Sequence, residues 1–254
     1  MTTAIVKRQH RAGIHREFLM DDPRVAQAVA WLRRRASKSV RDGMTRFAIP
    51  NTHALGVRMG DIQNLGKQLG RDHALAGQLW KTGIYEARML AAYVDEPERV
   101  TARQMDAQAR AFDNWAVCDT LCFALWVRSP HAFAKVRQWS ARREEFVRRA
   151  AFALLASLAL KARDVPDREF LRCLPLIRKA ATDERNFVMK GVSWALRGIG
   201  DRNRALHVAA KTLARELADS DERAARWIGK DALRQLASAS VQRRLRQRQS
   251  VLAK

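Results

Sequence analysis

The chain has few of the residues that characterise secreted, membrane-spanning or metal-dependent proteins. Three cysteines among 254 residues are too few for a disulfide framework. No apolar run is long enough to cross a bilayer, and residues 1–8 lack the apolar region of a signal peptide. The histidines show no metal-ligand spacing: His10, His15, His53, His73, His131 and His207. We therefore expect a cytoplasmic protein without a membrane partner, a metal or a cofactor.

Two of the cysteines stand close together in the sequence. Cys118 and Cys122 are four residues apart on a predicted helix, which puts them on one face. Such spacing can suit a metal ion, but no histidine lies nearby in the sequence to complete a site. We interpret both cysteines as small, buried packing residues.

Acidic residues are scarce relative to basic ones. Lysine and arginine total 48 against 26 acidic residues, which gives a formal net charge of +22. With 47% apolar and 29% charged residues, the composition is that of a folded protein. A field of this sign suits a polyanion, either nucleic acid or an acidic membrane surface. The basic residues are spread over most of the chain rather than gathered on one amphipathic segment, which favours nucleic acid.

Apolar residues recur with the period of an α-helix from Asp61 nearly to the end of the chain, and no segment alternates as a strand would. Asp22-Pro23 has the signal of a helix start, and Thr101-Ala-Arg-Gln104 that of a capping box. Residues 50–56 break the pattern and predict a loop. Residues 1–20 are basic and poorly patterned, which predicts a short helix or an arm.

A short motif recurs along the predicted helices: a β-branched residue, any residue, a charged residue, and a small or short one. Its charged positions are separated by 33, 30, 41 and 40 residues, and they are Glu86, Asp119, Arg149, Lys190 and Lys230. The last two spacings are the period of HEAT-type helical pairs. The sequence therefore predicts an all-α fold, a right-handed α-solenoid of HEAT-like helical pairs with a concave, positively charged face that binds DNA.

Stacking such repeats would align the charged positions in one row on the concave wall. Trp115 lies one helical turn before Asp119, while Trp194 and Arg197 follow Lys190 by four and seven residues. Tryptophans on a charged face are costly in water unless something stacks on them. Two simpler interpretations stay open, because charges near helix starts are usually just solvated and a single tryptophan more often belongs to a core.

Four segments, residues 83–97, 115–119, 149–151 and 190–197, occur in an order that resembles one known family. They are similar to the AlkD-like DNA alkylation repair glycosylases, which are HEAT-like helical solenoids. The resemblance covers about residues 55 to 240. We therefore assign residues 1–240 to a single solenoid domain, and residues 241–254 to a basic C-terminal tail with too little apolar content to pack.

The resemblance implies a DNA repair enzyme that grips duplex DNA and hydrolyses the N-glycosidic bond of N3- and N7-alkylated purines, such as 3-methyladenine and 7-methylguanine. Asp119 would be the catalytic carboxylate, with Trp115 and Trp194 as aromatic walls around the sugar. Arg149 and Arg197 would be phosphate-binding or site-forming cations. The cations expected to contact DNA are Arg58, Arg148, Lys190, Arg197 and Lys230.

The sequence departs from the family at two positions. The family often has proline where Gly60 stands and a basic residue near Asn64. The sequence also does not show which aromatic residue the N-terminal helices bring toward the lesion. Because no lysine stands out as a nucleophile, a monofunctional enzyme is expected, and nothing in the sequence demands more than a monomer.

The chemistry of the substrate explains why so few residues would suffice. A purine alkylated at N3 or N7 already carries positive charge, so it leaves without a general acid, one of the two carboxylates used in ordinary glycoside hydrolysis. One ionised carboxylate can stabilise the oxocarbenium-like sugar and position a water molecule. Tryptophan faces attract the cationic sugar. Neutral lesions such as uracil should not be released.

Two other functions remain open from the residues alone. A non-catalytic DNA-binding solenoid would use the same cationic groove without cleaving a bond. A protein–protein scaffold is the third interpretation, since concave solenoid surfaces commonly hold partner proteins. The scaffold leaves Asp119 within a basic row unexplained.

Overall fold

The computed structural model describes residues 22–252, with side chains up to residue 248; the predicted arm or helix at residues 1–20 lies outside this part. Among the described residues there is no strand, and no helix is long and apolar enough to cross a membrane. The elements are α1 (Pro23–Arg34), α2 (Lys38–Gly43), η1 (Met44–Phe47), α3 (Met59–Leu69), α4 (His73–Lys81), α5 (Tyr85–Val94), α6 (Ala102–Arg110), α7 (Trp115–Thr120), η2 (Leu121–Leu125), η3 (Trp126–Arg128), α8 (Ala132–Trp139), α9 (Glu145–Lys161), α10 (Asp167–Leu171), α11 (Leu174–Ala180), α12 (Asn186–Gly200), α13 (Arg204–Ala218), α14 (Arg223–Leu236) and α15 (Ala239–Leu252). Of the short elements, η1 and η3 are 3₁₀ turns and η2 is a π-helical turn.

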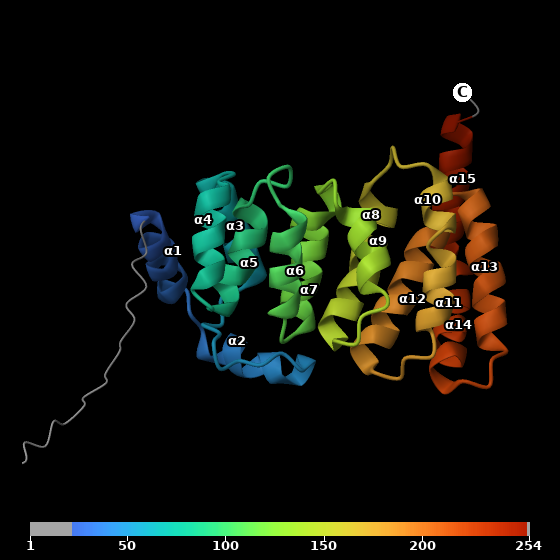
Figure 1. Cartoon of the computed structure of the whole chain (residues 1–254), viewed down its shortest axis with the longest axis horizontal. Helices are drawn as coiled ribbons and strands as arrows, with labels where there is room; N and C mark the ends of the chain where they lie inside the picture. Colours follow the sequence, from blue (N-terminus) through green and yellow to red (C-terminus); the bar gives the residue numbers. More distant parts are fainter. Residues whose placement is uncertain (1–21, 253–254) are drawn as a thin grey trace, which may run out of the picture.

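Most of the helices stand side by side in a row that broadly follows the order of the chain, while α2 lies crosswise below α3 and α5 (Figure 1). Within this row α5, α7, α9, α12 and α14 each contact the next. These helices carry the recurring charged motif, so the all-α solenoid of stacked helical pairs predicted from that motif is confirmed.

Short polar side chains begin several of the helices. Asp22 accepts a hydrogen bond from the backbone N–H of Arg24 at the start of α1, and Thr101 caps α6 in the same manner. Asn114 accepts from the Val117 N–H at 3.0 Å and so caps α7. Such caps satisfy backbone donors that have no partner within the helix, so they fix where each helix begins. The two helix starts predicted from cap signals are confirmed.

The centre of the solenoid is α9, in which residues 149–159 are all buried. A helix that is buried on every side lies between layers rather than on a surface. Close packing continues toward the C-terminus, where a Cβ added at Gly229 would lie 2.2 Å from the backbone nitrogen of Ala218. Glycine is therefore required where α14 crosses α13.

The C-terminal helix α15 packs against the solenoid. Val241 and Leu245 are buried, and Arg244 donates to both carboxylate oxygens of Asp201, at 3.1 and 2.8 Å. The prediction that this segment has too little apolar content to pack is therefore wrong for its described part. Two apolar side chains one turn apart suffice because Arg244 and Arg248 find partners at Asp201 and Arg202, which directly follow α12.

One member of the expected charged row is not on a surface. Glu86 is fully buried and accepts hydrogen bonds from the backbone N–H groups of Leu55, Gly56 and Val57. Gly56 has a φ of +83°, and a Cβ there would lie 2.2 Å from the backbone oxygen of Ser37. The predicted loop is thus anchored by Glu86, and the prediction that this glutamate joins an exposed row is wrong.

Candidate functional site

Asp119 and Arg149 form an ion pair with two hydrogen bonds between neighbouring helices, α7 and α9. Arg149 Nε donates to Asp119 Oδ1 at 2.9 Å, and Arg149 Nη2 donates to Asp119 Oδ2 at 2.7 Å. The arginine side chain is 8% exposed and the aspartate side chain 18% exposed. Because a planar guanidinium matches a carboxylate in this geometry, each group fixes the orientation of the other.

Arg149 also joins a third helix. Its Nη1 donates to the backbone oxygen of Phe187, in the first turn of α12, at 2.7 Å. The guanidinium therefore connects α7, α9 and α12 at one point. With its donors engaged in this way, Arg149 is suited to shaping the site rather than to binding a phosphate.

Trp115 lies beside the ion pair and is held by a segment from the N-terminal part of the chain. Its indole Nε1 donates to the backbone oxygen of Phe47, in η1, at 2.8 Å. The Arg149 guanidinium carbon lies 5.9 Å from the centre of a Trp115 ring, within the range of a cation–π contact. The structure thus brings together Trp115, Asp119 and Arg149, three of the residues singled out in the sequence.

A depression of about 430 Å³ opens beside Trp115 and Arg149. Its remaining walls come from η1, from the residue after it and from α12: Arg46, Phe47, Ala48, Asn186, Phe187 and Lys190. Phe47 is 62% exposed, and Ala48 has a left-handed φ of +53° that ends η1. Asp119 does not line the depression itself and adjoins it through its bonds to Arg149.

Phe47 is an aromatic residue at this depression that the sequence did not single out. It precedes the recurring motif, and 68 residues separate it from the tryptophan that it contacts. Its position just before the predicted loop could have indicated exposure. An aromatic side chain beside a break in the helical pattern has no helix face to bury it. Only the fold shows that it reaches Trp115.

The surroundings of the ion pair shift the pKa values of both Asp119 and Arg149. Burial raises the pKa of the Asp119 carboxyl above its ordinary value, and the hydrogen bonds and charge of Arg149 oppose that rise. Burial also acts to lower the pKa of Arg149, but its bonds to Asp119 outweigh burial and leave that pKa raised. On acidification, Asp119 therefore becomes neutral before an ordinary aspartate does.

The α-helical winding of α7 ends one residue after Asp119, at Thr120. The chain passes from α7 into the π-helical turn η2 over Leu121–Leu125. Cys118 and Cys122 are fully buried here, with their sulfur atoms 3.7 and 3.5 Å from backbone oxygens of α9. These contacts agree with the interpretation of both cysteines as packing residues, and no group of His, Cys, Asp or Glu side chains in the described part could hold a metal ion.

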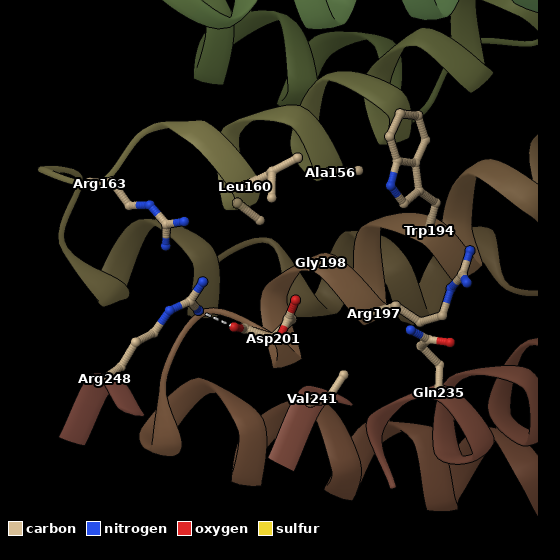
Figure 2. A pocket seen from close by; sticks show the side chains of 11 residues that line it. Ala156, Leu160, Arg163, Trp194, Arg197, Gly198, Asp201, Gln235, Val241 and Arg248 are labelled. Carbon is tan, nitrogen blue, oxygen red and sulfur yellow. Dashed lines mark hydrogen bonds between the residues drawn. The ribbon is translucent and has the colours of Figure 1, made fainter. Parts of the chain in front are cut away.

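Trp194 lies on α12 one turn beyond Lys190 and lines a different cavity. That cavity is bounded near Trp194 by Ala156, Leu160 and Arg197 (Figure 2). The residues around the depression at Trp115 do not include Trp194. Trp115 and Trp194 therefore do not face each other across one site. Lys190 still lines the depression at Trp115, but Trp194 lies about 6 Å farther along α12 and lines the other cavity.

The cations expected at DNA fall into two groups. Lys190, Lys230 and Arg58 are exposed and have no ion-pair partner within residues 22–248. Arg148 instead donates to Asp183 at 2.9 Å. Arg197 forms an ion pair with Asp231, in which Arg197 Nε lies 3.5 Å from Asp231 Oδ2. The first group is therefore free to meet a phosphate, whereas the second is already partnered.

These observations define a class of protein: a strongly basic, all-α solenoid in which a carboxylate and an arginine are paired beside a tryptophan. A family model described as "DNA alkylation repair enzyme" matches residues 28–236. The chain therefore belongs to the DNA alkylation repair enzyme family. A comparison with curated proteins finds no match.

Solved structures support the fold. One similar structure is described as "a new family of proteins related to the HEAT-like repeat DNA glycosylases with affinity for branched DNA structures". It is 16% identical over 83% of this chain and 94% of that chain, with a TM-score of 0.67. A designed armadillo repeat protein is 14% identical over 70% of this chain and 92% of that chain, with a TM-score of 0.32. The first likeness agrees with a HEAT-like solenoid.

Proposed function

We propose that this protein is a monofunctional DNA glycosylase that releases N3- and N7-alkylated, cationic purines from duplex DNA. The observation that carries the proposal is the Asp119–Arg149 pair, held beside Trp115 at the edge of an open depression. A single oriented carboxylate in a basic surface suits a reaction in which positive charge develops on a sugar bound to DNA. Membership of a DNA repair family supports the same conclusion.

The carboxylate of Asp119 would act on the sugar and on the attacking water. Each oxygen accepts one hydrogen bond from Arg149, and an ionised carboxylate oxygen has a further lone pair for a second partner. The negative charge would stabilise the oxocarbenium-like sugar as the cationic purine departs. The same group would orient a water molecule toward the anomeric carbon and receive its proton.

Aromatic and cationic side chains around the depression would hold the damaged nucleotide. Trp115 and Phe47 offer ring faces, which attract a cationic sugar or an alkylated base. Lys190 and Arg46 stand at the same depression and would neutralise phosphates, with Lys230 and Arg58 available for more distant ones. Trp194 and Arg197 would meet DNA only outside this depression.

A second candidate function is DNA binding without base release. It is favoured by one observation, that Arg149 already binds both oxygens of Asp119. A solved relative is also described as having affinity for branched DNA. In this alternative the ion pair would serve only to shape the surface that meets DNA.

The substrate range tests the proposal. Wild-type protein is incubated with duplexes that contain one 7-methylguanine, one 3-methyladenine or one uracil, and the free base is separated and quantified. We expect release of the two cationic purines and no release of uracil, because uracil departs poorly without a general acid. Firm binding of every duplex without any release would favour the second candidate, and equal release of uracil would contradict the proposed chemistry.

A further inference from the structure

A second arginine-rich pocket lies at the opposite end of α9 from the ion pair. It is bounded by the α9–α10 loop, the end of α12 and α15, and two adjoining cavities of about 180 and 790 Å³ share Arg163 and Arg248. Figure 2 shows these two arginines together at one end of the pocket and Trp194 at the other. Because an α-helix rises 1.5 Å per residue, the stretch from Arg149 to Arg163 spans about 20 Å.

Arg248 is fixed in orientation at this pocket. Its Nη1 donates to the backbone oxygens of Asp201 and Arg202, which follow the last residue of α12, and the bond to Arg202 is 2.8 Å long. Both acceptors are main-chain atoms, so within the described residues the positive charge of Arg248 has no carboxylate in an ion pair with it. The nitrogen atoms of the guanidinium other than Nη1 remain available for a ligand.

Arg163 is exposed and lines both cavities, yet its side chain has no hydrogen-bond or ion-pair partner in the described part of the chain. The carboxylate of Asp201 is held by Arg244, which donates to both of its oxygens, and it forms no ion pair with Arg163 in the described part of the chain. Burial lowers the pKa of Arg248, and the positive charge of Arg163 lowers it further. The carboxylate of Asp201 raises that pKa without restoring its ordinary value, and neither arginine forms an ion pair in the described part of the chain.

We propose that this pocket binds a phosphate group of DNA, with Arg163 and Arg248 as its donors. Two guanidinium groups can donate several charge-assisted hydrogen bonds to the oxygens of one phosphate, and a bound anion relieves their mutual repulsion. DNA is favoured over an acidic peptide because the chain belongs to a DNA repair family. The proposal rests on DNA as the ligand of the proposed function, and it does not depend on base release.

The bound phosphate has two chemical sources, a backbone phosphodiester or a terminal phosphate monoester. Because the pocket is about 20 Å from the ion pair, this phosphate belongs to a part of the DNA other than the nucleotide at Asp119. The site would thus hold flanking DNA while the lesion lies at the depression. Arg163 is the better residue to test, since Arg248 also holds α15 in place.

The test measures DNA affinity by fluorescence anisotropy across a salt series, with undamaged duplexes that carry or lack a 5′-phosphate. We compare wild type with Arg163→Gln, Arg163→Lys and the matched control Arg103→Gln, which removes an exposed arginine without an ion-pair partner from α6. For Arg163→Gln we expect about five- to tenfold weaker binding near 0.1 M salt, and a salt slope reduced by about one. Arg163→Lys should keep most of the slope, and Arg103→Gln should match wild type.

The possible outcomes distinguish a backbone phosphodiester from a terminal phosphate, and they distinguish failure of the phosphate site from failure of the proposed glycosylase function. Loss of affinity on both duplexes supports a backbone phosphodiester, whereas loss confined to the 5′-phosphorylated duplex supports a terminal phosphate. Unchanged affinity and slope in Arg163→Gln would overturn the phosphate site. Because the duplexes are undamaged, failure of wild type to release alkylated bases would count against the proposed function alone.

Discussion

Arg149 donates two hydrogen bonds to Asp119, at 2.9 and 2.7 Å, and a third to the backbone of Phe187 at 2.7 Å. One guanidinium therefore orients the carboxylate at the candidate site and joins three helices of the solenoid. Under the proposed function, a change to either partner should affect both the stability of the fold and the rate of base release. The two effects must be measured separately.

The first prediction concerns stability. Arg149→Gln should lower the free energy of unfolding by about 3–5 kcal/mol, because it leaves a largely buried carboxylate without its partner. Asp119→Asn should cost less than Arg149→Gln, because burial already raises the pKa of this carboxyl and so disfavours its charge in the folded state, and the double variant should lose less than the sum of the two. Urea denaturation measures each value, with Arg103→Gln as the surface control. An Arg149→Gln variant within about 0.5 kcal/mol of wild type would mean that the pair is not formed in solution.

The second prediction concerns pH. In the proposed reaction, base release needs an ionised Asp119, and burial raises the pKa of this carboxyl. As pH falls, the rate should therefore decline at a pH above the ordinary aspartate value of about 3.9. Release of 7-methylguanine is measured against pH, with the loss in protein-free samples subtracted. A rate that is constant down to that ordinary value would contradict the role of Asp119.

Because the pKa of Asp119 is raised rather than lowered, the expected decline in the rate of base release can be distinguished from acid unfolding. A folded state whose carboxyl has a raised pKa binds the proton more tightly than the unfolded state, so protonating Asp119 does not itself promote unfolding. Asp183 behaves in the opposite way: burial acts to raise its pKa, but its bonds to Arg185 leave the pKa lowered. Its stabilising contribution is present above the ordinary value and is lost only below it. Circular dichroism should thus show a folded protein while activity declines.

The third prediction concerns Phe47. Because this side chain is 62% exposed, Phe47→Ala should change the free energy of unfolding by less than about 0.5 kcal/mol. Loss of one aromatic face at the depression should still lower kcat/KM for 7-methylguanine release about tenfold, the effect of one stacking contact. Phe123→Ala is a matched control, since Phe123 is also exposed but lies at another surface cavity. Equal activity of the two variants would exclude Phe47 from the site.

The fourth prediction compares two neighbouring cations. Lys190 is exposed at the depression without an ion-pair partner in the described part, so Lys190→Gln should reduce the salt slope of DNA binding by about one. Arg148 is paired with Asp183, so Arg148→Gln should lower stability and leave the slope unchanged. Anisotropy titrations at several salt concentrations give both slopes. The reverse pattern would show that Arg148 rather than Lys190 faces DNA.

Much of the fold followed from local patterns. The recurring charged motif identified α5, α7, α9, α12 and α14 as stacked helices, since helical periodicity and repeat spacing are encoded within short segments. The place of Glu86 was not predictable, because its burial depends on a loop that folds back onto α5. The docking of α15 was also missed, since it needs only Val241 and Leu245 plus partners that lie about forty residues earlier.

The candidate site was predictable in part for the same reason. The pairing of Trp115 with Asp119 follows from their spacing on one helix, and that of Asp119 with Arg149 from the repeat. Phe47 could not be placed, because it reaches Trp115 through a contact between segments far apart in the chain. The separation of Trp194 from Trp115 depends on how α12 lies against α9, which no local pattern specifies.

The most direct test of the central claim is release of free 7-methylguanine from duplex DNA by wild type and by Asp119→Asn. Both proteins are checked for folding by thermal melting and for binding by anisotropy, and saturating protein is used so that affinity does not limit the rate. The account predicts release by wild type and a loss of at least about a hundredfold in the variant, with DNA binding retained. Equal release by both proteins would show that Asp119 is not the catalytic carboxylate.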